Sequence, residues 1–525
     1  MTEWAAGLET AFQWQSLLYL LLGLVGGVGV GAVPGLSATM GIAVLLPFTF
    51  VMDPLHGMML LLGIYTGAVY AGSIPAILIR LPGTPASAAT VLDGYAMTQQ
   101  GKGGQALTIS LVTSCVGALI GGVLLALFAP LLADVALLFG PAEYTMLALF
   151  ALAVIGSMSE GNLVKGIVAG IVGLLVATIG IDPIDGYARF TFGLDGLTGG
   201  IGFIPVLIGL FGVAEGLVRA ERHLLSGAAG GQAIRSFAPE RGTWRRLTPG
   251  TLYSSLIGFV VGVLPGTGGD IGSFVGHNEV RRISKNTEMF GRGDPRGLAA
   301  AESANNSSVP GTVAPTLVLG IPGNSAAAVL IGAITVHGLR PGPQLFTGEP
   351  DLVYGIFVAL IIAPLLMLLV GGLGIRLWSR ITWVPQQYLW PAVLTLCVIG
   401  AYAIRTSLLD VMAMTAAGVL GYLMIKGGFP LAPVVIGLIV GPILEANFRR
   451  ATIVAGGSFD WVLAPLPLVL LLVTVLTLGL TLWRAWRSRR ETAPGDAADT
   501  DPTHGAFGGE DPAEIHDTDD EGARR

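Results

Sequence analysis

Charged side chains are scarce in this sequence. Asp, Glu, Lys and Arg make up 12% of its 525 residues, whereas 53% are hydrophobic, and the mean hydropathy is +0.73. A soluble domain of ordinary composition carries roughly 25% charged residues. No long stretch has the composition of a soluble catalytic domain, so the chain is not expected to be an enzyme of that kind.

Cysteines and basic clusters are scarce as well. The two cysteines, Cys115 and Cys397, lie in apolar runs without metal-site spacing, and we interpret them as small buried hydrophobic residues. No basic patch predicts nucleic-acid binding. A GxxxxGK[ST] phosphate loop is also missing, because Gly101-Lys102 lacks the rest of the motif. The sequence therefore argues against ATP hydrolysis by this chain, although it does not test for an ATPase on a separate chain.

Long apolar runs and glycines are abundant instead. A bilayer requires about 17–25 apolar residues per helix, and the 77 glycines suit close helix packing in lipid. We therefore predict an all-α polytopic membrane protein with about 10–14 transmembrane or re-entrant helical segments. The N-terminal segment lacks a basic region and a cleavage site, so it is predicted to be a first membrane helix. The clearest apolar runs are Leu17–Val33, Leu107–Leu131, Leu352–Leu373 and Val462–Leu482, with Val411–Ile425 shorter.

Basic residues predict the orientation, because they favour the cytoplasmic side. The arginine-rich loop Arg219–Arg246 and the segment Trp483–Arg490 are placed inside, whereas the N-terminus carries Glu3 and Glu9 and is placed outside. The acidic tail after residue 490 lacks periodicity and is predicted to be disordered and cytoplasmic. The protein is expected in the plasma (inner) membrane, with a cytoplasmic C-terminus.

Two pairs of similar segments occur in the same order. GVGVGAVPG (27–35) resembles GFVVGVLPG (258–266), and IPAILIRLPGTPASA (74–88) resembles APTLVLGIPGNSAAA (314–328). We predict a duplicated chain with a first membrane half (1–218), a basic cytoplasmic loop (219–246), a second membrane half (247–490) and the acidic tail (491–525).

The orientation of the two halves follows from the charges. The first member of the pair enters the membrane from outside, and the second follows the basic loop and enters from inside, so we predict inverted repeats, a common transporter design. The basic residues between Arg281 and Arg296 conflict with this, because they would lie outside. A helical hairpin returning to the cytoplasm would remove the conflict.

Four Pro-Gly pairs interrupt apolar segments. Such pairs break helices, and non-helical backbone survives in a membrane only where protein or a water-filled cavity covers it. Each break points the N-terminus of a new half-helix at the interruption, which favours an anion such as a carboxylate; the alternative is an ordinary kink or loop. The predicted substrate-binding residues are Pro34, Gly35, Ser37, Gly83, Thr84, Gly266, Thr267, Gly323, Asn324 and Ser325.

A polar stretch, AAAESANNSSVPG (299–311), precedes the last break. Hard cations prefer amide and carboxylate oxygens, and a carboxyl group inside a membrane can instead carry a proton. The predicted cation-coupling residues are Glu302, Asn305, Asn306 and Ser307, and the alternative is a polar loop at the membrane interface. No resident metal is expected beyond a transported sodium ion. Weaker candidates are Asp53, Asp270, Glu215 and Glu445.

Several long motifs together resemble one family. The chain is similar to the large membrane subunit of the bacterial tripartite tricarboxylate transporters from about residue 15 to 485, with YAGS (70–73) as a small departure. The motifs are PGLSATMGIAVLLPFTF (34–50), YAGSIPAILIRLPGTPASAATVLDGY (70–95), IGIDPIDGYARFTFG (179–193), VLPGTGGDIGSF (263–274), ESANNSSVPGTVAPTLVLGIPGNSAAAVLIGA (302–333) and LIVGPILEANFRR (438–450).

The resemblance implies a function and partners. It implies secondary uptake of a tri- or dicarboxylate such as citrate, driven by a sodium or proton gradient, with no cofactor and no enzymatic activity. It also implies a small membrane subunit and an extracytoplasmic solute-binding protein as partners. The family's Pro-Gly and Asn-Asn elements map onto Pro34-Gly35, Pro82-Gly83, Asn305-Asn306 and Pro322-Gly323. A channel, or an ATP-independent permease for another small organic anion, remains the alternative.

Overall fold

The computed structural model describes residues 2–157, 163–182, 184–223, 237–240, 242–265, 268–381 and 386–491. Gly266, Thr267, most of the basic loop and the acidic tail from residue 492 lie outside these residues. The chain divides into two compact units, Met1–Gly479 and Leu480–Arg525. The sites and helix contacts below all belong to the first unit.

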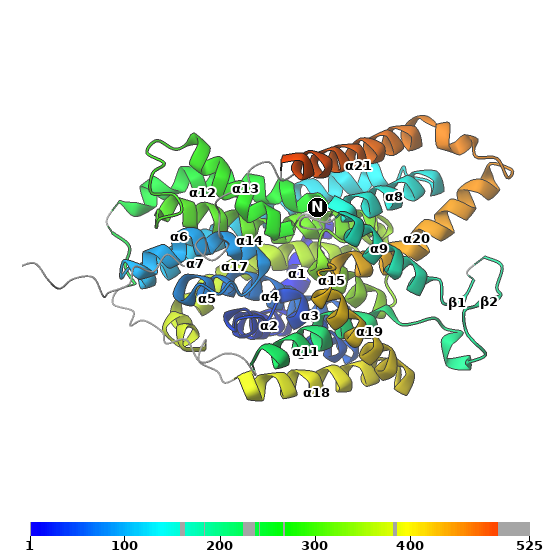
Figure 1. Cartoon of the computed structure of the whole chain (residues 1–525), viewed down its shortest axis with the longest axis horizontal. Helices are drawn as coiled ribbons and strands as arrows, with labels where there is room; N and C mark the ends of the chain where they lie inside the picture. Colours follow the sequence, from blue (N-terminus) through cyan, green and yellow to red (C-terminus); the bar gives the residue numbers. More distant parts are fainter. Residues whose placement is uncertain are drawn as a thin grey trace, which may run out of the picture. The chain divides into compact units, whose positions relative to one another are not determined.

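Helices make up 80% of the structure (Figure 1). The longer helices of the first part are α1 (Thr2–Ala11), α2 (Trp14–Ala32), α3 (Ala38–Leu45), α4 (Pro54–Ala71), α5 (Ser73–Ile79), α6 (Ala88–Gln99), α7 (Gly103–Ala136), α8 (Pro141–Ser157), α9 (Leu163–Ala177), α10 (Phe203–Leu207) and α11 (Ala214–His223). Shorter elements between them are η1 (Leu46–Val51), η2 (Pro85–Ser87), η3 (Asp195–Leu197), the π-helical η4 (Ile208–Val213) and the two-residue strands β1 (Gly180–Ile181) and β2 (Ala188–Arg189).

The second part of the chain is also helical. They are α12 (Thr243–Val263), α13 (Gly268–Ile283), α14 (Pro295–Leu319), α15 (Ser325–Val336), α16 (Gln344–Gly348), α17 (Pro350–Ile381), α18 (Gln386–Arg405), α19 (Leu408–Lys426), α20 (Ala432–Val454), η5 (Asp460–Leu463) and α21 (Pro465–Glu491). The strands β1 and β2 pair antiparallel, with Gly180 opposite Arg189 and Ile181 opposite Ala188.

Among the described residues, six helical segments are long and apolar enough to cross a membrane, and seven shorter apolar helices accompany them. The long segments are Trp14–Ala32, Pro54–Ile79, Gly103–Ala136, Pro350–Ile375, Leu408–Lys426 and Ala432–Val454. The structure thus confirms the predicted all-α polytopic membrane protein.

Glycines set the closest helix contacts. A Cβ on Gly27 of α2 would lie 2.4 Å from the carbonyl oxygen of Ile64 in α4, and one on Gly258 of α12 would lie 2.1 Å from that of Ala304 in α14. Because no larger residue fits, these glycines let the backbones touch, as helices in lipid require. Gly27 and Gly258 occupy equivalent positions of the first pair of similar segments found in the sequence.

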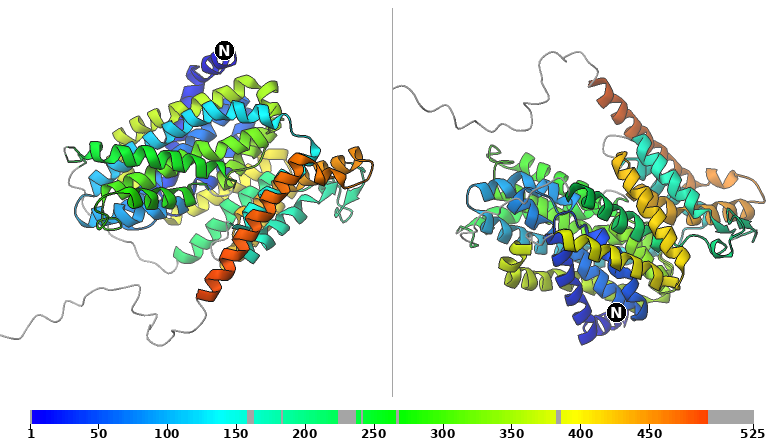
Figure 2. Two further views of the ribbon diagram at one scale, coloured as in Figure 1. Left: turned by 90° about the horizontal axis from the view of Figure 1, so that it is seen from above. Right: turned by 60° about the horizontal axis from the view of Figure 1, so that its bottom comes forward.

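Helix α14 is enclosed by its neighbours, although it is polar. Every residue from Gly297 to Val318 is buried, and α7, α12 and α13 pack around it (Figure 1). A Cβ on Gly117 of α7 would lie 2.2 Å from the carbonyl oxygen of Ser303. The polar side chains of α14 are therefore held inside protein rather than against lipid. The further views in Figure 2 show the green helices α12–α14 as one group beside the blue ones.

Helices α12 and α13 form a hairpin. Gly250 lies against Val280, Gly276 against Ser254, and Gly272 against Gly258, which is an antiparallel pairing. The basic end of α13 therefore lies at the same end of the hairpin as the start of α12. With this arrangement, the basic residues between Arg281 and Arg296 lie on the same side of the membrane as the basic loop, so the charge conflict is removed. The inverted orientation of the two halves stays a prediction.

The chain reverses in the same way after α5 and after α14. Arg80 and Gly320 end these helices in the left-handed conformation, with φ of 60° and 68°. The next amides, of Leu81 and Ile321, donate to the carbonyls of Pro75 and Pro315. Each Pro-Gly break then runs back along the preceding helix, so that the following helix begins inside the bundle.

Candidate functional site

A cavity of about 600 Å³ opens where several helices begin. Its size falls in the range of small-molecule sites, about 300–1,000 Å³. Its lining comes from the starts of α3, η2, α13, α15 and α20 and from the sides of α4, η4 and α14. The lining residues are Ser37, Ala38, Thr39, Tyr65, Val69, Thr84, Pro85, Ala86, Phe211, Gly269, Asp270, Ile271, Asn305, Ser308, Val309, Asn324, Ser325, Ala326 and Gly428–Pro433.

Two of the helix starts are capped by side chains from the predicted site. Ser37 Oγ accepts a hydrogen bond from the Met40 amide at 3.1 Å, and Asn324 Oδ1 accepts from the Ala327 amide at 2.8 Å. The remaining amides of the first turn have no partner within their helix. Since the helix dipoles also point their positive ends here, the cavity wall favours a bound anion.

The Asn324 amide also links two parts of the wall. Its Nδ2 donates to Tyr65 Oη at 2.7 Å, and Tyr65 Oη lies 3.0 Å from Thr312 Oγ1 of α14. This chain of hydrogen bonds joins α4, α14 and α15 at the cavity. It fixes the orientation of Asn324 relative to the cavity.

The predicted substrate residues take two kinds of position. Ser37, Thr84, Asn324 and Ser325 line the cavity. The glycines lie behind it: a Cβ on Gly83 would meet the Gly31 carbonyl oxygen at 2.7 Å, and one on Gly323 would meet Thr312 Cα at 2.7 Å. Pro34 and Gly35 are buried and are not among the lining residues, and Gly266 and Thr267 are not described. The prolines and glycines therefore shape the turns, and the polar residues after them face the ligand.

The predicted cation-coupling residues point in different directions around α14. Asn305 faces the cavity. Asn306 donates to Ser114 Oγ of α7 and to the Glu302 carbonyl, and Ser307 donates to the Ser255 carbonyl of α12. Glu302 binds hydroxyl groups of α6 and α7. Glu302 and Asn306 thus share Ser114 as a partner, whereas Asn305 faces the cavity and Ser307 faces α12.

Asn305 is the one of these four residues that lines the cavity. Its side chain is buried, yet neither Oδ1 nor Nδ2 has a hydrogen-bond partner among the described residues. A buried amide without partners is costly, so this group is ready to bind a solute, an ion or water in the cavity. Ser308 Oγ and the start of α13 border the same spot.

Tyr65, Phe211 and the segment Gly428–Pro433 were missed by sequence reasoning. The last of these, GFPLAP, is a further glycine- and proline-containing break before an apolar helix, so the same signal could have found it. Tyr65 and Phe211 carried no sequence signal. Asp270, a weaker candidate, is the one ionisable carboxyl group on the described lining, which includes no Lys, Arg or His.

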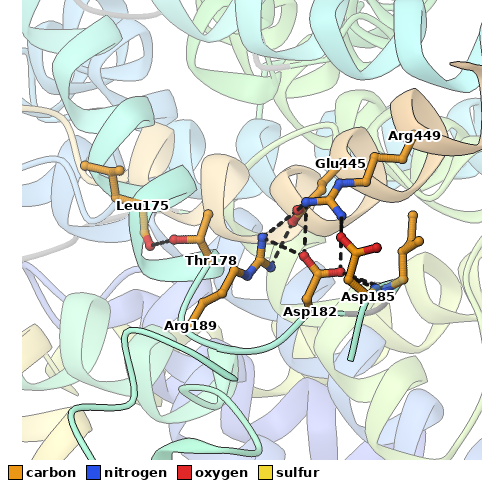
Figure 3. A network of polar contacts seen from close by, with 8 residues as sticks. Leu175, Thr178, Asp182, Asp185, Arg189, Glu445 and Arg449 are labelled. Carbon is orange, nitrogen blue, oxygen red and sulfur yellow. Dashed lines mark hydrogen bonds and ion pairs between the residues drawn. The ribbon is translucent and has the colours of Figure 1, made fainter. Parts of the chain in front are cut away.

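A separate ionic network joins the β1–β2 segment to α20 (Figure 3). Arg189 donates to both carboxylate oxygens of Glu445, at 2.6 and 3.1 Å. Arg449 bonds Asp185 at 2.8 Å and lies 3.0 Å from Asp182. These residues come from two of the motifs that carry the family resemblance, although no pattern in the chain predicts that they pair.

The network holds a buried carboxylate. The amides of Asp185 and Ile184, and then the charges of Arg449 and Arg189, lower the pKa of Asp182 below its usual value. Because the folded pKa is depressed, the stabilisation is present at neutral pH and is lost only as the pH falls through that lowered pKa.

Replacing Arg449 by alanine is expected to loosen residues 178–202. Asp182 and Asp185 each lose a cationic partner, and Asp182 is left buried beside one arginine. Limited proteolysis of the purified protein should show several-fold faster cleavage in this segment. The matched control is Arg450→Ala, because Arg450 is exposed and forms no ion pair among the described residues. Equal cleavage rates in the two variants would contradict a holding role for Arg449.

Interrupted helices that begin at one polar cavity, inside an all-helical membrane protein, are the architecture of a membrane transporter. The comparisons agree with that class. The chain belongs to the tripartite tricarboxylate transporter TctA family, whose model matches residues 17–436. It is thus a large membrane subunit of that kind of transporter, in a family of transporters rather than enzymes.

Two Agrobacterium vitis proteins resemble the chain. An uncharacterized 52.8 kDa protein in the TAR-I ttuC' 3'region is 37% identical over 486 residues, which cover 92% of this chain and 97% of that protein. An uncharacterized protein in the TAR-II ttuC' 3'region is 36% identical over 235 residues, covering 45% of this chain and 97% of that protein. No solved structure matches the chain.

Proposed function

We propose that this protein takes up a small carboxylate, a tri- or dicarboxylate such as citrate, across the plasma membrane. Uptake is driven by a sodium or proton gradient. An extracytoplasmic solute-binding protein delivers the carboxylate, and a small membrane subunit completes the complex. The C-terminus and the basic loop lie in the cytoplasm.

The observation that carries the proposal is the cavity. Helix starts at Ser37, Thr84 and Asn324 meet there. They offer amide and hydroxyl donors to an anion, and the described lining contributes no lysine, arginine or histidine. Family membership supports transport of this substrate class.

The cavity also suits coupling to a cation. Asn305 Oδ1, Ser308 Oγ and Asp270 bring oxygen atoms to the same wall, close to where the carboxylate would lie. A cation there would reduce the repulsion between Asp270 and a bound carboxylate.

The proposal is tested by uptake of radiolabelled citrate into proteoliposomes that contain the chain with its two partners. A sodium or proton gradient should drive accumulation, and Asn305→Ala should lower the apparent affinity for citrate or for the driving cation about tenfold, the loss of a hydrogen bond to a charged group. Asn278→Ala on the exposed side of α13 is the control and should behave as wild type. Wild-type affinities in Asn305→Ala would place the binding site elsewhere.

A further inference from the structure

A carboxyl group is buried beside the cavity wall without a positive partner. Glu302 of α14 has no exposed surface. Ser110 and Ser114 of α7 lie 3.0 and 2.9 Å from its Oε2, and Thr90 of α6 binds its Oε1. Among the described residues, no lysine, arginine or histidine forms an ion pair with it.

The side chains that hydrogen-bond to Glu302 are uncharged hydroxyl groups. Tyr70 of α4 and Cys115 of α7 are the titratable side chains near it. On α6 and α13, Asp93 and His277 bind each other at 2.9 Å, and Asp270 of α13 lies on the cavity. From α12, the side chains that reach α14 are serines, such as Ser254 against Ser303. An ionised Glu302 would therefore have hydroxyl groups as its whole compensation.

The contacts around Glu302 outnumber the protons of the hydroxyl groups that make them. Ser73 Oγ contacts the Tyr70 carbonyl at 2.7 Å and Ser110 Oγ at 2.8 Å. Thr90, Ser110, Ser114 and Ser73 all bond the carboxyl group as well, so that six contacts are served by four hydroxyl protons. Asn306 Nδ2 donates a hydrogen bond to Ser114 Oγ. This bond uses a proton of the amide, so it does not change the number of hydroxyl protons.

A protonated Glu302 supplies one further proton to these contacts. Its acid proton goes to Ser110, the Ser110 proton to Ser73, and the Ser73 proton to the Tyr70 carbonyl, while Thr90 and Ser114 donate to the carboxyl group. If Glu302 is ionised, the same chain leaves two oxygen atoms facing each other without a proton. Oxygen separations of 2.7–3.0 Å are those of hydrogen bonds.

We infer that Glu302 is the site that binds and releases the coupling proton, separately from the cavity that holds the carboxylate. The inference rests on the proposed function and identifies its driving ion as a proton. In this structure, the contacts are those of the proton-loaded state.

The site is connected to the cavity through α6. Thr90 lies in the first turn of α6, directly after η2, whose residues Pro85 and Ala86 line the cavity. Thr84, also on the lining, contacts Ser87 Oγ at 2.8 Å. Release of the proton changes the pull of Glu302 on Thr90 and thereby shifts the wall on which the carboxylate rests. On α14 itself, Asn305 faces the cavity one turn after Glu302.

Infrared spectroscopy of the full-length protein in membranes tests the protonation directly. A protonated carboxylic acid has a carbonyl stretch apart from the amide bands, and this band moves in deuterium oxide. We expect the band at neutral pH in wild type and in Glu349→Gln, an exposed control, and not in Glu302→Gln, whose amide imitates the protonated acid. Absence of the band in wild type, or its survival in Glu302→Gln, would overturn the inference.

Two serine variants test whether the hydroxyl groups set the proton affinity of Glu302. Ser73→Ala and Ser114→Ala each remove a hydroxyl group that bonds the carboxyl group, so the band should persist to a pH about one unit higher in each, a tenfold change in proton affinity. A band that disappears at the wild-type pH in both variants would contradict this role, even if Glu302→Gln failed to accumulate.

Transport assays separate this inference from the proposed function. In proteoliposomes with the partner subunits, Glu302→Gln should lose citrate accumulation driven by a pH gradient but retain exchange of labelled for unlabelled citrate. Retained gradient-driven accumulation would exclude Glu302 as the coupling site. If wild type itself moves no citrate, the proposed function fails for that carboxylate, whereas the infrared result still decides whether Glu302 holds a proton.

Discussion

Asn324→Asp is expected to raise the citrate concentration for half-maximal uptake at least about tenfold. The new carboxylate still caps α15, because aspartate accepts from a helix amide as well as asparagine does. It also places a negative charge at the anion end of the cavity. Two unit charges about 4 Å apart repel by roughly 1 kcal/mol in water and about 4 kcal/mol near a protein surface, and 1.4 kcal/mol corresponds to a factor of ten.

Asn324→Ser is the matched control for this prediction. Serine also caps a helix, and it also removes the Nδ2 bond to Tyr65, but it adds no charge. Its half-saturation should stay within a few-fold of wild type, measured by initial rates of radiolabelled citrate uptake. If the aspartate and serine variants behave alike, the carboxylate does not bind at the start of α15.

Gly27→Ala is expected to destabilise the folded protein by about 1–3 kcal/mol, the cost of overpacking a filled contact. The added Cβ would meet backbone atoms of Ile64 at 2.4, 2.7 and 2.9 Å, and backbone cannot rotate away as a side chain can. The α2–α4 contact would have to open along its length. Gly258→Ala should do the same to the α12–α14 contact, where Ala304 blocks the new atom.

The control lies two residues away on the same helix. A Cβ on Gly29 meets nothing within 4 Å, so Gly29→Ala should leave stability unchanged or slightly raised, since alanine favours a helix. Thermal unfolding of the detergent-solubilised protein, followed by size-exclusion chromatography, measures both. Equal melting temperatures for Gly27→Ala and Gly29→Ala would show that α2 and α4 do not approach each other so closely.

The glycine contacts and the cavity depend on each other. Helix α14 can carry Glu302, Asn305 and Asn306 inside a membrane protein because glycines of α7 and α12 bring backbone against it on two sides. These contacts leave room for the polar side chains to find partners, except at the Asn305 amide, where the cavity begins, and at Asn306 Oδ1. Loss of a glycine contact is therefore expected to disturb transport as well as folding.

Much of the local structure could be predicted from the sequence. The Pro-Gly breaks do end helices, and the polar residues that follow Pro34 and Pro322 do cap the next ones, because backbone chemistry is local. The spacing of Glu302, Asn305 and Asn306 also places them on one side of α14, because residues three and four apart on a helix are neighbours. Their joint role in binding an ion stays a prediction.

The pairing of remote residues could not be predicted. Asp182 and Arg449 meet only because the β1–β2 segment lies against α20, and Glu302 meets Ser110 only because α7 packs on α14. Neither contact leaves a periodic signal in the chain. Each arises from side chains brought together by packing of elements far apart in sequence.

The sequence by itself determined that this is a helical membrane protein with interrupted segments, because hydropathy and Pro-Gly chemistry act over a few residues. Its motifs also determined the family. Only the tertiary structure decided which polar residues face the cavity and which face each other. The reason is physical: the direction of a side chain acquires meaning only from the helix packed opposite it, and that neighbour is chosen by contacts spread over the whole bundle.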